Sequence, residues 1–461
     1  MGEDRLMVSV SGVRGTIGST LTPIVACEFG CAFGTYLGAG KTVVIGRDTR
    51  PSGAMVQSAV TAGLLAAGVS VVDLGVASTP GIALMIARTK SDGGVVITAS
   101  HNPIEYNGIK FLQPTGPGLT AAAAAKLKSL WQAKAFKLAG AVNLGQLSRN
   151  TKTHAEHVDA VCAVVDSLAI ASKRFKVVLD SINGAGCVAT PMLLGRLGCE
   201  YVHLNGEATG RFAHTPEPIR ENITDLCTAV RKHKAAVGFA QDPDADRLVI
   251  VDENGNFLGE EYTLALAMAF ALRTRKGKVA TNLVTSRMVD DVAAAAGCQV
   301  IRTPTGEANV AEAMAREGCV FGGEGNGGVM DPRVIPVRDS LVGIAMILQY
   351  MAQTGKTISQ LAAEIPAYQF IKTKFPCPEG VAPKVIGKVK AEFADRKDAK
   401  FNESDGLRVD LPEGWLSVRA SNTEPIMRIV AEARDAATAR SLVDQARALA
   451  DAVIGKKPQQ G

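Results

Sequence analysis

Apolar and polar positions along the first part of the chain follow a rhythm of short strands and longer helices. Helix starts are predicted at Thr22-Pro23 and Thr79-Pro80, because proline lacks an N–H and the first helical turn does not need one. Strands are predicted at 42–45, 69–74 and 94–97, and a helix from 53 to about 68. Strands that alternate with helices are typical of an α/β domain with a parallel sheet.

The same order of elements recurs three times. The segments that begin at Leu64 (LLAAGVSVVDLG), Leu193 (LLGRLGCEYVHLNG) and Val292 (VAAAAGCQVIRTPTG) each have the pattern of a helix end, a capping glycine, a strand and a glycine turn. Glycine is common just after a helix because it adopts the left-handed backbone that ends the helix. We therefore predict three related α/β domains in tandem.

Changes in this pattern indicate where domains end. A helix at 121–135 and a linker at 139–150 close the first domain, and Asn254-Gly255 is a hairpin turn near the end of the second. A helix at 339–354 has an apolar face. After Pro366, a hairpin at 407–418 and one amphipathic helix predict a smaller α+β domain. The predicted domains are 1–150, 151–254, 255–366 and 367–461.

Composition narrows the possible classes of function. A chain of 461 residues exceeds what one hydrophobic core serves, which agrees with several domains. The net charge of +5 is mild and there are no dense basic runs, so we expect no nucleic-acid partner. Nine scattered cysteines without zinc-type spacing, no signal-like N-terminus and no apolar run of membrane-spanning length predict a cytoplasmic protein without membrane contact.

The segment 94–111 carries the first candidate chemistry. An apolar strand leads into the polar turn Thr98-Ala99-Ser100-His101-Asn102-Pro103, so Ser100 lies where parallel sheets bind ligands. We expect Asn107-Gly108 to turn the chain back and bring Lys110 beside the serine. The alternative is that Ser100 only caps the loop and His101 fills a polar pocket. The Gly-x-Ser-x-Gly motif of hydrolase nucleophiles is absent, which argues against a hydrolase-type serine. A different hypothesis is that Ser100 carries a phosphoryl group. This hypothesis predicts a metal site and a basic cradle elsewhere.

A candidate metal loop lies between predicted strands at 236–241 and 248–252. Asp242, Asp244 and Asp246 repel one another unless a cation sits among them, and oxygen ligands suit Mg²⁺ or Mn²⁺. An EF-hand is excluded because Arg247 stands where its loop needs glycine. The alternative is a solvated turn. Next to the aspartates, Arg247 could hold an anionic fourth ligand such as phosphoserine.

Two further stretches suggest ligand contacts. Around a Ser421-Asn422-Thr423 turn, Arg419 and Arg428 would form a phosphate clamp, although a turn with incidental ion pairs remains an alternative. The glycine-rich stretch 321–329 allows a ligand to approach the backbone closely, and its Glu324 and Asn326 could pair with sugar hydroxyls.

Together these motifs resemble the α-D-phosphohexomutase family over essentially the whole chain. The matching motifs are TASHNP (98–103), GRFAHTPEPIREN (210–222), DPDADR (242–247), GEGNGG (323–328) and RASNTEP (419–425). The resemblance implies three α/β domains with mixed sheets and a smaller C-terminal α+β domain around a central cleft. It also implies that the enzyme interconverts hexose 6-phosphate and hexose 1-phosphate through a 1,6-bisphosphate.

The resemblance also implies roles for individual residues. Ser100 would be the phosphoserine and would share one Mg²⁺ with Asp242, Asp244 and Asp246. Arg14, Lys110 and His101 would assist proton transfer. The sugar would be recognised by Glu324 and Asn326, and its phosphate would be bound by Arg419, Ser421, Asn422, Thr423 and Arg428. A hexose 1,6-bisphosphate would act as activator, the partners would be small hexose phosphates, and the chain would be a monomer or homodimer.

The chain departs from the family pattern in its sugar loop. Gly328 stands where many members have a histidine, Asn326 replaces a serine, and Pro304 replaces a lysine of glucose- and mannose-type members. GEGNGG resembles archaeal-type phosphoglucosamine mutases, although PEPIREN is unlike the bacterial glucosamine type. The resemblance therefore favours glucosamine 6-phosphate as substrate, with phosphomannomutase/phosphoglucomutase activity as the alternative. A metal-dependent phosphatase and a non-catalytic sugar-phosphate binding protein are the remote alternatives.

Overall fold

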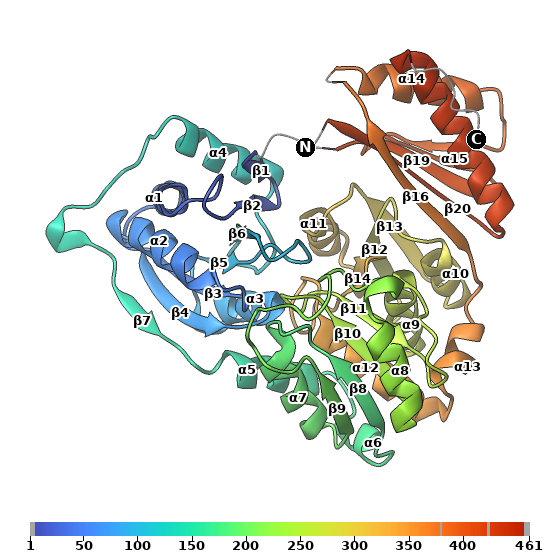
Figure 1. The fold of residues 1–461 in the computed structure, drawn as a ribbon, viewed down its shortest axis with the longest axis horizontal. Coiled ribbons are helices and arrows are strands. Elements are labelled where there is room, and N and C mark those ends of the chain that lie inside the picture. The colour runs from blue at the N-terminus through green and yellow to red at the C-terminus, as the bar shows by residue number, and fades with distance from the viewer. Residues whose placement is uncertain (1–4, 379, 422–424, 456–461) are drawn as a thin grey trace.

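A computed structural model of the chain describes residues 5–378, 380–421 and 425–455. Within these residues the main strands form four sheets, and the four domains follow one another along the chain from the blue end to the red end of Figure 1. The predicted fold class is confirmed, because three α/β domains with mixed sheets precede a smaller α+β domain. None of the described helices combines the length and the apolar character needed to span a membrane.

The first three domains contain the same four-stranded unit. In each, the first strand pairs in parallel with the second on one side and with the third on the other, and the fourth returns antiparallel to the third. The strand orders are β4-β3-β5-β6 within the first sheet, β9-β8-β10-β11 in the second and β13-β12-β14-β15 in the third.

The predicted tandem repeat coincides with this unit. Gly68, Gly198 and Gly297 have φ values of 78°, 68° and 67°, and each follows the helix that leads to the second strand of its unit. Glycine reaches this backbone without the steric cost of a Cβ, which explains why it recurs at this position.

The first domain extends its unit to seven strands in the order β1-β2-β6-β5-β3-β4-β7. Its elements are β1 (Met7–Ser9), β2 (Gly12–Thr16), α1 (Pro23–Leu37), β3 (Thr42–Arg47), α2 (Gly53–Ala66), β4 (Ser70–Val76), α3 (Thr79–Thr89), β5 (Gly93–Ile97), β6 (Tyr106–Leu112), α4 (Ala121–Gln132), a 3₁₀ turn (Ala141–Asn143) and β7 (Leu147–Arg149).

Two predictions for this domain are wrong. Asn107-Gly108 is not a turn, because both residues lie inside β6 and pair with β2, while the chain reverses in the loop before Tyr106. The buried Asn107 side chain donates to Ser52 Oγ at 2.9 Å, so a tertiary contact replaces the local turn preference. The predicted linker at 139–150 contains β7, which pairs in parallel with β4 and covers the edge of the sheet.

The second and third domains lie side by side below and to the right of the first in Figure 1. The elements of the second are α5 (Thr153–Cys162), α6 (Ser167–Ala171), β8 (Lys176–Asp180), α7 (Gly186–Arg196), β9 (Glu200–Leu204), a 3₁₀ turn (Arg220–Asn222), α8 (Thr224–His233), β10 (Val237–Gln241) and β11 (Leu248–Val251). Those of the third are α9 (Glu260–Thr274), β12 (Lys278–Asn282), α10 (Met288–Ala295), β13 (Gln299–Thr303), α11 (Glu307–Glu317), β14 (Phe321–Glu324), β15 (Gly328–Met330), α12 (Ser340–Thr354) and α13 (Ile358–Ala363).

The predicted helix at 339–354 is confirmed as α12, whose apolar face is buried together with almost all of its other residues. It packs against α9 and β15 of its own domain and against α5 and α6 of the second domain, which cover the rest of its circumference. At its start, Asp339 caps the helix and its Oδ2 lies 2.7 Å from His157 Nε2, while His157 Nδ1 lies 3.3 Å from Ser78 Oγ. This buried chain of polar contacts joins three domains at one point.

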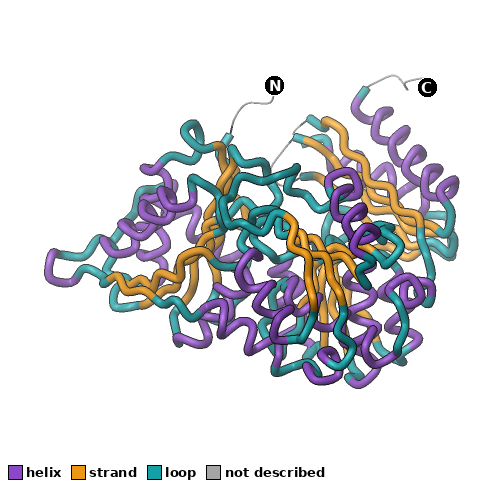
Figure 2. Tube along the Cα trace, turned by 60° about the horizontal axis from the view of Figure 1, so that its bottom comes forward, coloured by secondary structure: helices purple, strands orange, loops and turns teal. Residues whose placement is uncertain are grey.

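The fourth domain is an antiparallel sheet in the order β16-β20-β19-β18-β17 with helices α14 and α15. Its own hydrophobic core is separate from the large core that runs through the first three domains. In Figure 2 its sheet lies at one end of the molecule beside the C-terminus. The elements are β16 (Gln369–Pro376), α14 (Ala382–Phe393), β17 (Lys400–Asn402), β18 (Leu407–Asp410), β19 (Gly414–Ala420), β20 (Ile426–Ala433) and α15 (Ala436–Ile454).

Candidate active site

The candidate site is built from one equivalent connection of the repeated unit in each of three domains. The loop between the third and fourth strands contains Ser100 in the first domain, the three aspartates in the second and Asn326 in the third. The aspartate loop contacts the serine loop, and the first residue of the strand after it contacts the loop of the third domain. Ser100 Oγ donates to Asp242 Oδ2 at 2.9 Å, and the Leu248 N–H donates to the Gly327 carbonyl at 3.0 Å. Three motifs far apart in the sequence therefore meet at one place.

Ser100 is buried at the start of this site, with only 1% of its surface exposed. Its backbone has a φ of 49°, in the left-handed region that non-glycine residues seldom adopt. This backbone directs Oγ toward the metal loop of another domain. His101 Nδ1 lies 3.5 Å from the same oxygen. Burial and the positive charges of Arg247 and Arg14 lower the pKa of His101 to about 2, so its imidazole is neutral.

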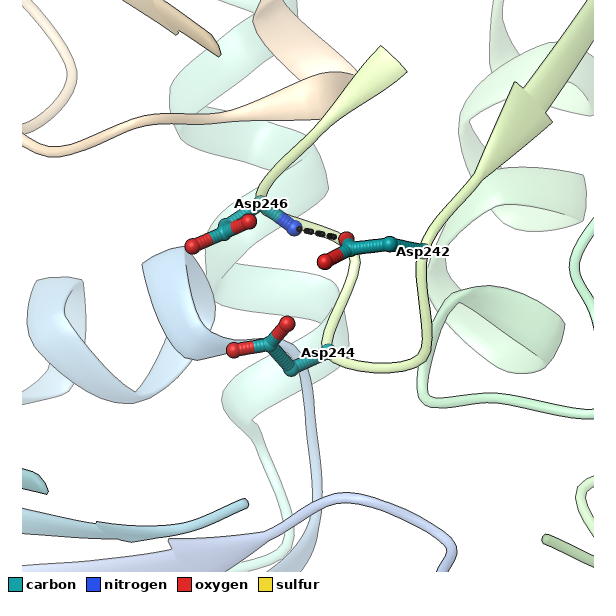
Figure 3. A group of neighbouring side chains, drawn as sticks. All are labelled: Asp242, Asp244 and Asp246. Carbon is teal, nitrogen blue, oxygen red and sulfur yellow. Dashed lines mark hydrogen bonds between the residues drawn. The ribbon is translucent and has the colours of Figure 1, made fainter. Parts of the chain in front are cut away.

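The three aspartates of the second domain converge as Figure 3 shows. Their ligand oxygens lie within 4.8 Å of one another, and all three side chains are fully buried. The loop is tight, because Asp242 Oδ1 accepts from the Asp246 N–H at 3.1 Å and Ala245 has a φ of 55°. Ser340, the first residue of α12, donates from Oγ to the Ala245 carbonyl at 2.6 Å and so holds the loop from below.

The residues of this cluster fit a divalent cation. Asp244 Oδ1 and Asp246 Oδ1 are buried and have no hydrogen-bond partner among the described residues. Burial, followed by repulsion from Asp246 and Asp244, raises the pKa of Asp242 well above its ordinary value. Three close carboxylates with unpaired oxygens are the donor set that Mg²⁺ accepts. The solvated-turn alternative is wrong, because the turn is buried.

Two cations border the carboxylates. Lys110 Nζ donates to Asp244 Oδ2 at 2.7 Å and lies 3.7 Å from Asp246 Oδ2. Burial alone would lower the pKa of Lys110, but attraction to Asp244 and Asp246 outweighs it and the net pKa is raised. Arg247 donates its N–H to Asp242 Oδ1 at 3.1 Å, and its buried Nε has no hydrogen-bond partner among the described residues. Arg247 thus offers a donor for an added anion.

Arg14 completes the cluster from β2 of the first domain. Its Nη1 donates to Asn102 Oδ1 at 3.1 Å, which places the guanidinium against the serine loop. Burial lowers the pKa of Arg14, and Arg247 and Arg338 lower it further while Asp244 opposes them. The structure therefore brings Ser100, His101, Lys110, Arg14 and Arg247 to the aspartates, and their individual roles stay predictions.

Arg338 is a residue of this site that the sequence analysis missed. It donates to Asp246 Oδ2 at 2.6 Å, to Glu324 Oε2 at 2.8 Å and to Glu307 Oε2 at 3.1 Å. Its partners lie between 14 and 92 positions away along the chain, so no local pattern marks it. Thr79 was missed for the same reason, and its Oγ1 donates to Asp244 Oδ2 at 2.6 Å.

Arg338 also explains why glycine stands at 328. A Cβ at Gly328 would lie 2.2 Å from Arg338 Cδ, so any side chain there would displace the arginine. The histidine that the resemblance leads one to expect is thus incompatible with this position of Arg338. The guanidinium fills the space beside the sugar-loop hairpin and joins it to the metal loop.

The two predicted sugar-loop residues differ in their contacts. Glu324 is buried at the end of β14, where Oε1 accepts from Asn282 Nδ2 at 2.7 Å and from the Gly306 N–H at 3.2 Å. Asn326 Oδ1 is buried without a hydrogen-bond partner among the described residues. Hydrogen bonds therefore fix the Glu324 side chain, while Asn326 Oδ1 could accept a hydrogen bond from a ligand.

The predicted phosphate clamp lies in the fourth domain. Arg419 on β19 and Arg428 on β20 are directly opposite in the sheet, which places two like charges on one face. Burial lowers the pKa of Arg419, and attraction to Asp405 opposes this. Attraction to Glu324 also raises the pKa, so the arginine of the fourth domain interacts electrostatically with the glutamate of the sugar loop. Ser421 donates its N–H to the Ile426 carbonyl at 2.9 Å. Asn422 and Thr423 lie outside the described residues.

The fourth domain rests on the third next to the site. Arg287 Nη2 donates to Asp410 Oδ1 at 3.0 Å and to the Gly414 carbonyl at 3.0 Å, and Arg408 donates to the Leu283 carbonyl. Thr305 donates its N–H to Asp405 Oδ2 at 3.0 Å. The last contact joins the loops that contain Pro304 and Asp405. Together these hydrogen bonds hold the fourth domain against the third domain beside the site.

Comparison with known proteins agrees with this arrangement. The chain matches "Phosphoglucomutase/phosphomannomutase, alpha/beta/alpha domain I" over 5–138, domain II over 155–255, domain III over 259–368 and the C-terminal domain over 373–449. The exact domain boundaries given above stay predictions.

Curated relatives cover nearly the whole chain. A "Phosphoglucomutase/phosphomannomutase" from Thermococcus kodakarensis is 41% identical over 439 residues, which are 94% of this chain and 96% of the relative. A "Probable phosphoglucosamine mutase" from Methanopyrus kandleri is 38% identical over 94% of this chain and 95% of the relative. The crystal structure of a phosphoglucomutase/phosphomannomutase family protein from Burkholderia thailandensis is similar with a TM-score of 0.85 and 28% identity, covering 97% of both chains. This chain belongs to the phosphoglucomutase/phosphomannomutase family.

Proposed function

We propose that the protein is a phosphohexomutase that interconverts hexose 6-phosphate and hexose 1-phosphate. The observation that supports this most directly is the 2.9 Å hydrogen bond from Ser100 Oγ to Asp242, a member of the buried carboxylate cluster of another domain. A serine used only as a loop cap has no need of a cation site next to its hydroxyl. A serine that carries a phosphoryl group does, because that group bears a charge of about −1.5 to −2 near neutrality.

The proposed reaction has two phosphoryl transfers. Phosphorylated Ser100 gives its phosphoryl group to the free hydroxyl of a hexose monophosphate, the Oγ–P bond breaks, and the hydroxyl proton passes to a neighbouring base. The resulting 1,6-bisphosphate reorients, and Ser100 Oγ takes the other phosphoryl group back. His101 lies 3.5 Å from Ser100 Oγ, Lys110 bonds to Asp244 and Arg14 bonds to Asn102 of the serine loop. These three residues are the proposed groups that move the proton. A hexose 1,6-bisphosphate would load Ser100 initially.

Asp242, Asp244 and Asp246, with a phosphate oxygen on Ser100, would hold Mg²⁺. When bound, the ion supplies positive charge to the phosphoryl oxygens. The chain's own residues supply the rest of the charge: Arg247 and Arg14 face the serine loop, and Arg419 and Arg428 would hold the phosphate that does not react. The fourth domain has a separate core, which suits a clamp that opens and closes over a reorienting intermediate.

We propose an amino sugar, glucosamine 6-phosphate, as the preferred substrate. On the sugar side of the site, the two carboxylates of Glu307 and Glu324 share the single guanidinium of Arg338, which also bonds to Asp246 of the metal loop, so carboxylates outnumber the cation there. An acidic pocket favours a sugar with an ammonium group. Several archaeal relatives carry the name probable phosphoglucosamine mutase. The name of the 41% identical relative from Thermococcus kodakarensis, "Phosphoglucomutase/phosphomannomutase", supports that activity as the second candidate.

The test is ³¹P NMR of the purified protein with Mg²⁺, catalytic hexose 1,6-bisphosphate and one of three substrates. Glucosamine 6-phosphate, glucose 1-phosphate and mannose 1-phosphate are compared in parallel. We expect conversion of the amino sugar to exceed that of the others. Comparable turnover of glucose and mannose phosphates would favour the second candidate, and release of inorganic phosphate alone would identify a phosphatase. Ser100→Ala should remove turnover and retain sugar-phosphate binding, and full activity in that variant would exclude the mechanism.

A further inference from the structure

Arg50 is a fully buried cation whose function the proposed reaction does not explain. It is 0% exposed and belongs to the segment GRDTRPSG, which begins in the last two residues of β3 of the first domain. Its Nη2 donates to the carbonyls of Ser100 at 2.6 Å and Asn102 at 2.7 Å, and its Nη1 donates to those of Pro103 at 2.6 Å and Tyr106 at 3.1 Å. One guanidinium thus determines the path of the whole serine loop.

The contacts of Arg50 close a ring through Ser100. The Ser100 N–H donates to Thr98 Oγ1 at 2.9 Å, and Thr98 Oγ1 donates to Asp48 Oδ2 at 2.6 Å. The same Asp48 oxygen accepts from Arg50 Nε at 3.1 Å, and Arg50 returns to the Ser100 carbonyl. Thr98 and Asp48 are also 0% exposed. The backbone N–H and C=O of the serine are therefore held by the two ends of one chain of side chains.

A segment of the second domain covers this ring. The Phe212 ring lies over the Arg50 guanidinium with 4.9 Å between its centroid and Cζ. Gly210 lies so close that a Cβ there would be 1.9 Å from the Thr49 carbonyl oxygen, and Thr49 Oγ1 donates to the Asn183 carbonyl at 2.7 Å. Gly210 and Phe212 belong to the stretch 210–222, for which the proposed reaction gives no role. Their position seals the ring against water, which strengthens its electrostatic contacts.

The ring contains a buried ion pair, which is an unfavourable way to do no more than stabilise a loop. Burying an ion pair removes two charges from water, and the desolvation penalty often equals or exceeds the attraction between them. Ser100 additionally adopts the left-handed backbone at φ 49°, which is maintained only where surrounding contacts determine it. Both features become useful if the direction of Ser100 Oγ has to be fixed. Misplacement of a reacting group by 1 Å can cost about 100-fold in rate.

We propose that Asp48, Arg50 and Thr98 are positioning residues that fix the orientation of Ser100 for phosphoryl transfer, with Phe212 as their cover from the metal-binding domain. The inference rests on the proposed function, because it needs Ser100 to be the phosphoryl carrier. Loss of the ring leaves the sugar and phosphate contacts in place and misdirects Oγ. The effect therefore falls on kcat and on the rate of Ser100 phosphorylation, while KM is maintained.

The sharpest test uses the pair Thr98→Val and Thr98→Ser in the full-length protein. Valine retains the shape and removes the hydroxyl, and serine retains the hydroxyl and removes a methyl group. We expect Thr98→Val to lower kcat by about 100-fold with KM within about twofold, and Thr98→Ser to restore most of kcat. Phosphorylation of Ser100 by hexose 1,6-bisphosphate, followed by mass spectrometry, should slow in the same order, and the ³¹P shift of the phosphoserine should change in Thr98→Val.

Arg50→Lys gives an independent readout, because lysine retains the charge and loses the fork that reaches four carbonyls. It should behave as Thr98→Val does. The matched control is Arg275→Gln, which removes a part-buried arginine that pairs with Asp331 at 3.0 Å and donates to the Val320 carbonyl at 3.1 Å. This control should lower Tm and leave kcat unchanged.

The outcomes separate the inference from the reaction on which it depends. If wild-type Ser100 acquires no phosphoryl group, the proposed function fails, whatever the variants do. If wild-type Ser100 is phosphorylated and Thr98→Val turns over like wild type, the positioning role is overturned. Equal losses of kcat in Thr98→Val and Thr98→Ser, in proportion to their losses of Tm, would also overturn it, since they would show a purely structural role.

Discussion

Nη2 of Arg338 lies 2.6 Å from Oδ2 of Asp246, so an arginine of the third domain forms an ion pair with the metal loop of the second. The same guanidinium bonds to Glu324 at the end of the sugar-loop strand. Burial would lower the pKa of Arg338, but Asp246, Glu324 and Glu307 outweigh it and raise the pKa well above its ordinary value. A single charge thus connects the aspartate cluster with the proposed sugar-binding loop.

Replacement of Arg338 should therefore affect both stability and activity. Arg338→Met leaves three carboxylates without their shared cation, and breaking a buried ion pair typically costs about 3–5 kcal/mol. We expect urea unfolding to show a loss of that size and kcat/KM to fall by at least about 100-fold. Arg333→Met is the control, because Arg333 pairs with Asp331 but its side chain is 39% exposed. That variant should lose less than about 1 kcal/mol. Equal losses in the two variants would contradict the special position of Arg338.

Mg²⁺ should stabilise the folded protein through the aspartate cluster. The buried oxygens of Asp244 and Asp246 that lack partners among the described residues gain a ligand when the ion binds. A ligand at 100 times its Kd adds about 2.7 kcal/mol. Thermal unfolding with EDTA or with Mg²⁺ should show a higher Tm with the metal, and Asp244→Asn should weaken this response. An unchanged Tm together with no heat of binding in calorimetry would argue against a metal site.

Glu261 should make stability depend on pH. It lies on α9 below the sugar loop, where Oε2 accepts from the Ser286 N–H at 3.0 Å and the Cβ position of Gly325 is 1.9 Å from that oxygen. Burial raises the pKa of Glu261 from 4.5 to about 8. A raised pKa means that the neutral side chain's contribution is fully present below pH 4.5 and is lost as the pH rises through 8.

The variant Glu261→Gln retains the acceptor for Ser286 and removes this titration. We expect Tm of the wild type to fall relative to Glu261→Gln when the pH rises from 5 to 9. The control is Glu260→Gln on the preceding residue, which contacts Lys372 at 3.5 Å near the surface and should track the wild type. Parallel curves for wild type and Glu261→Gln would contradict the prediction.

Gly327 should be needed for both stability and activity. It has a φ of 84°, and a Cβ there would lie 2.3 Å from the Leu248 carbonyl oxygen at the start of β11. Gly327→Ala would therefore add a backbone penalty and separate the sugar-loop hairpin from the metal loop. Gly355→Ala is the matched control, because Gly355 has a φ of 69° with open space around its Cβ position.

We expect Gly355→Ala to lose about 1 kcal/mol and to retain activity. Gly327→Ala should lose clearly more and reduce kcat/KM, as measured by denaturant unfolding and the mutase assay. Similar behaviour of the two variants would show that the contact between the hairpin and Leu248 is unimportant.

Much of the fold was predictable because the decisive signals are local. A glycine after each helix and a short apolar run after each glycine sufficed to find the three-fold repeat. The aspartate loop was visible because three carboxylates lie on one tight turn. The predicted turn at Asn107-Gly108 failed because a distant contact overrides local preference, as β2 incorporates both residues into a sheet. For α12 the apolar face was predictable, and the burial of its other residues comes from packing against the second domain.

The site was predictable only in part for the same reason. Motifs with unusual composition, such as those around Ser100 and Asp242, are recognisable on their own. Thr79 is the first residue of α3 and Arg338 lies two residues before α12, and only the folded chain brings them to the aspartates. The sequence shows that Gly328 replaces the histidine of the family pattern, but it does not show the reason. The reason is Arg338, which is ten positions away along the chain and fills the space that a side chain at 328 would need.

The location of the three reactive loops at one equivalent connection has a consequence for how this protein can change. Each connection joins two strands whose pairing is fixed by the sheet, so residues of a connection that contact no other loop can change without disturbing the core beneath. The proposed nucleophile, cation site and sugar contact thereby lie on three loops of different domains. A mutation in one loop can retune substrate choice while the other two keep the phosphoryl chemistry, which gives the scaffold a simple route to new sugars.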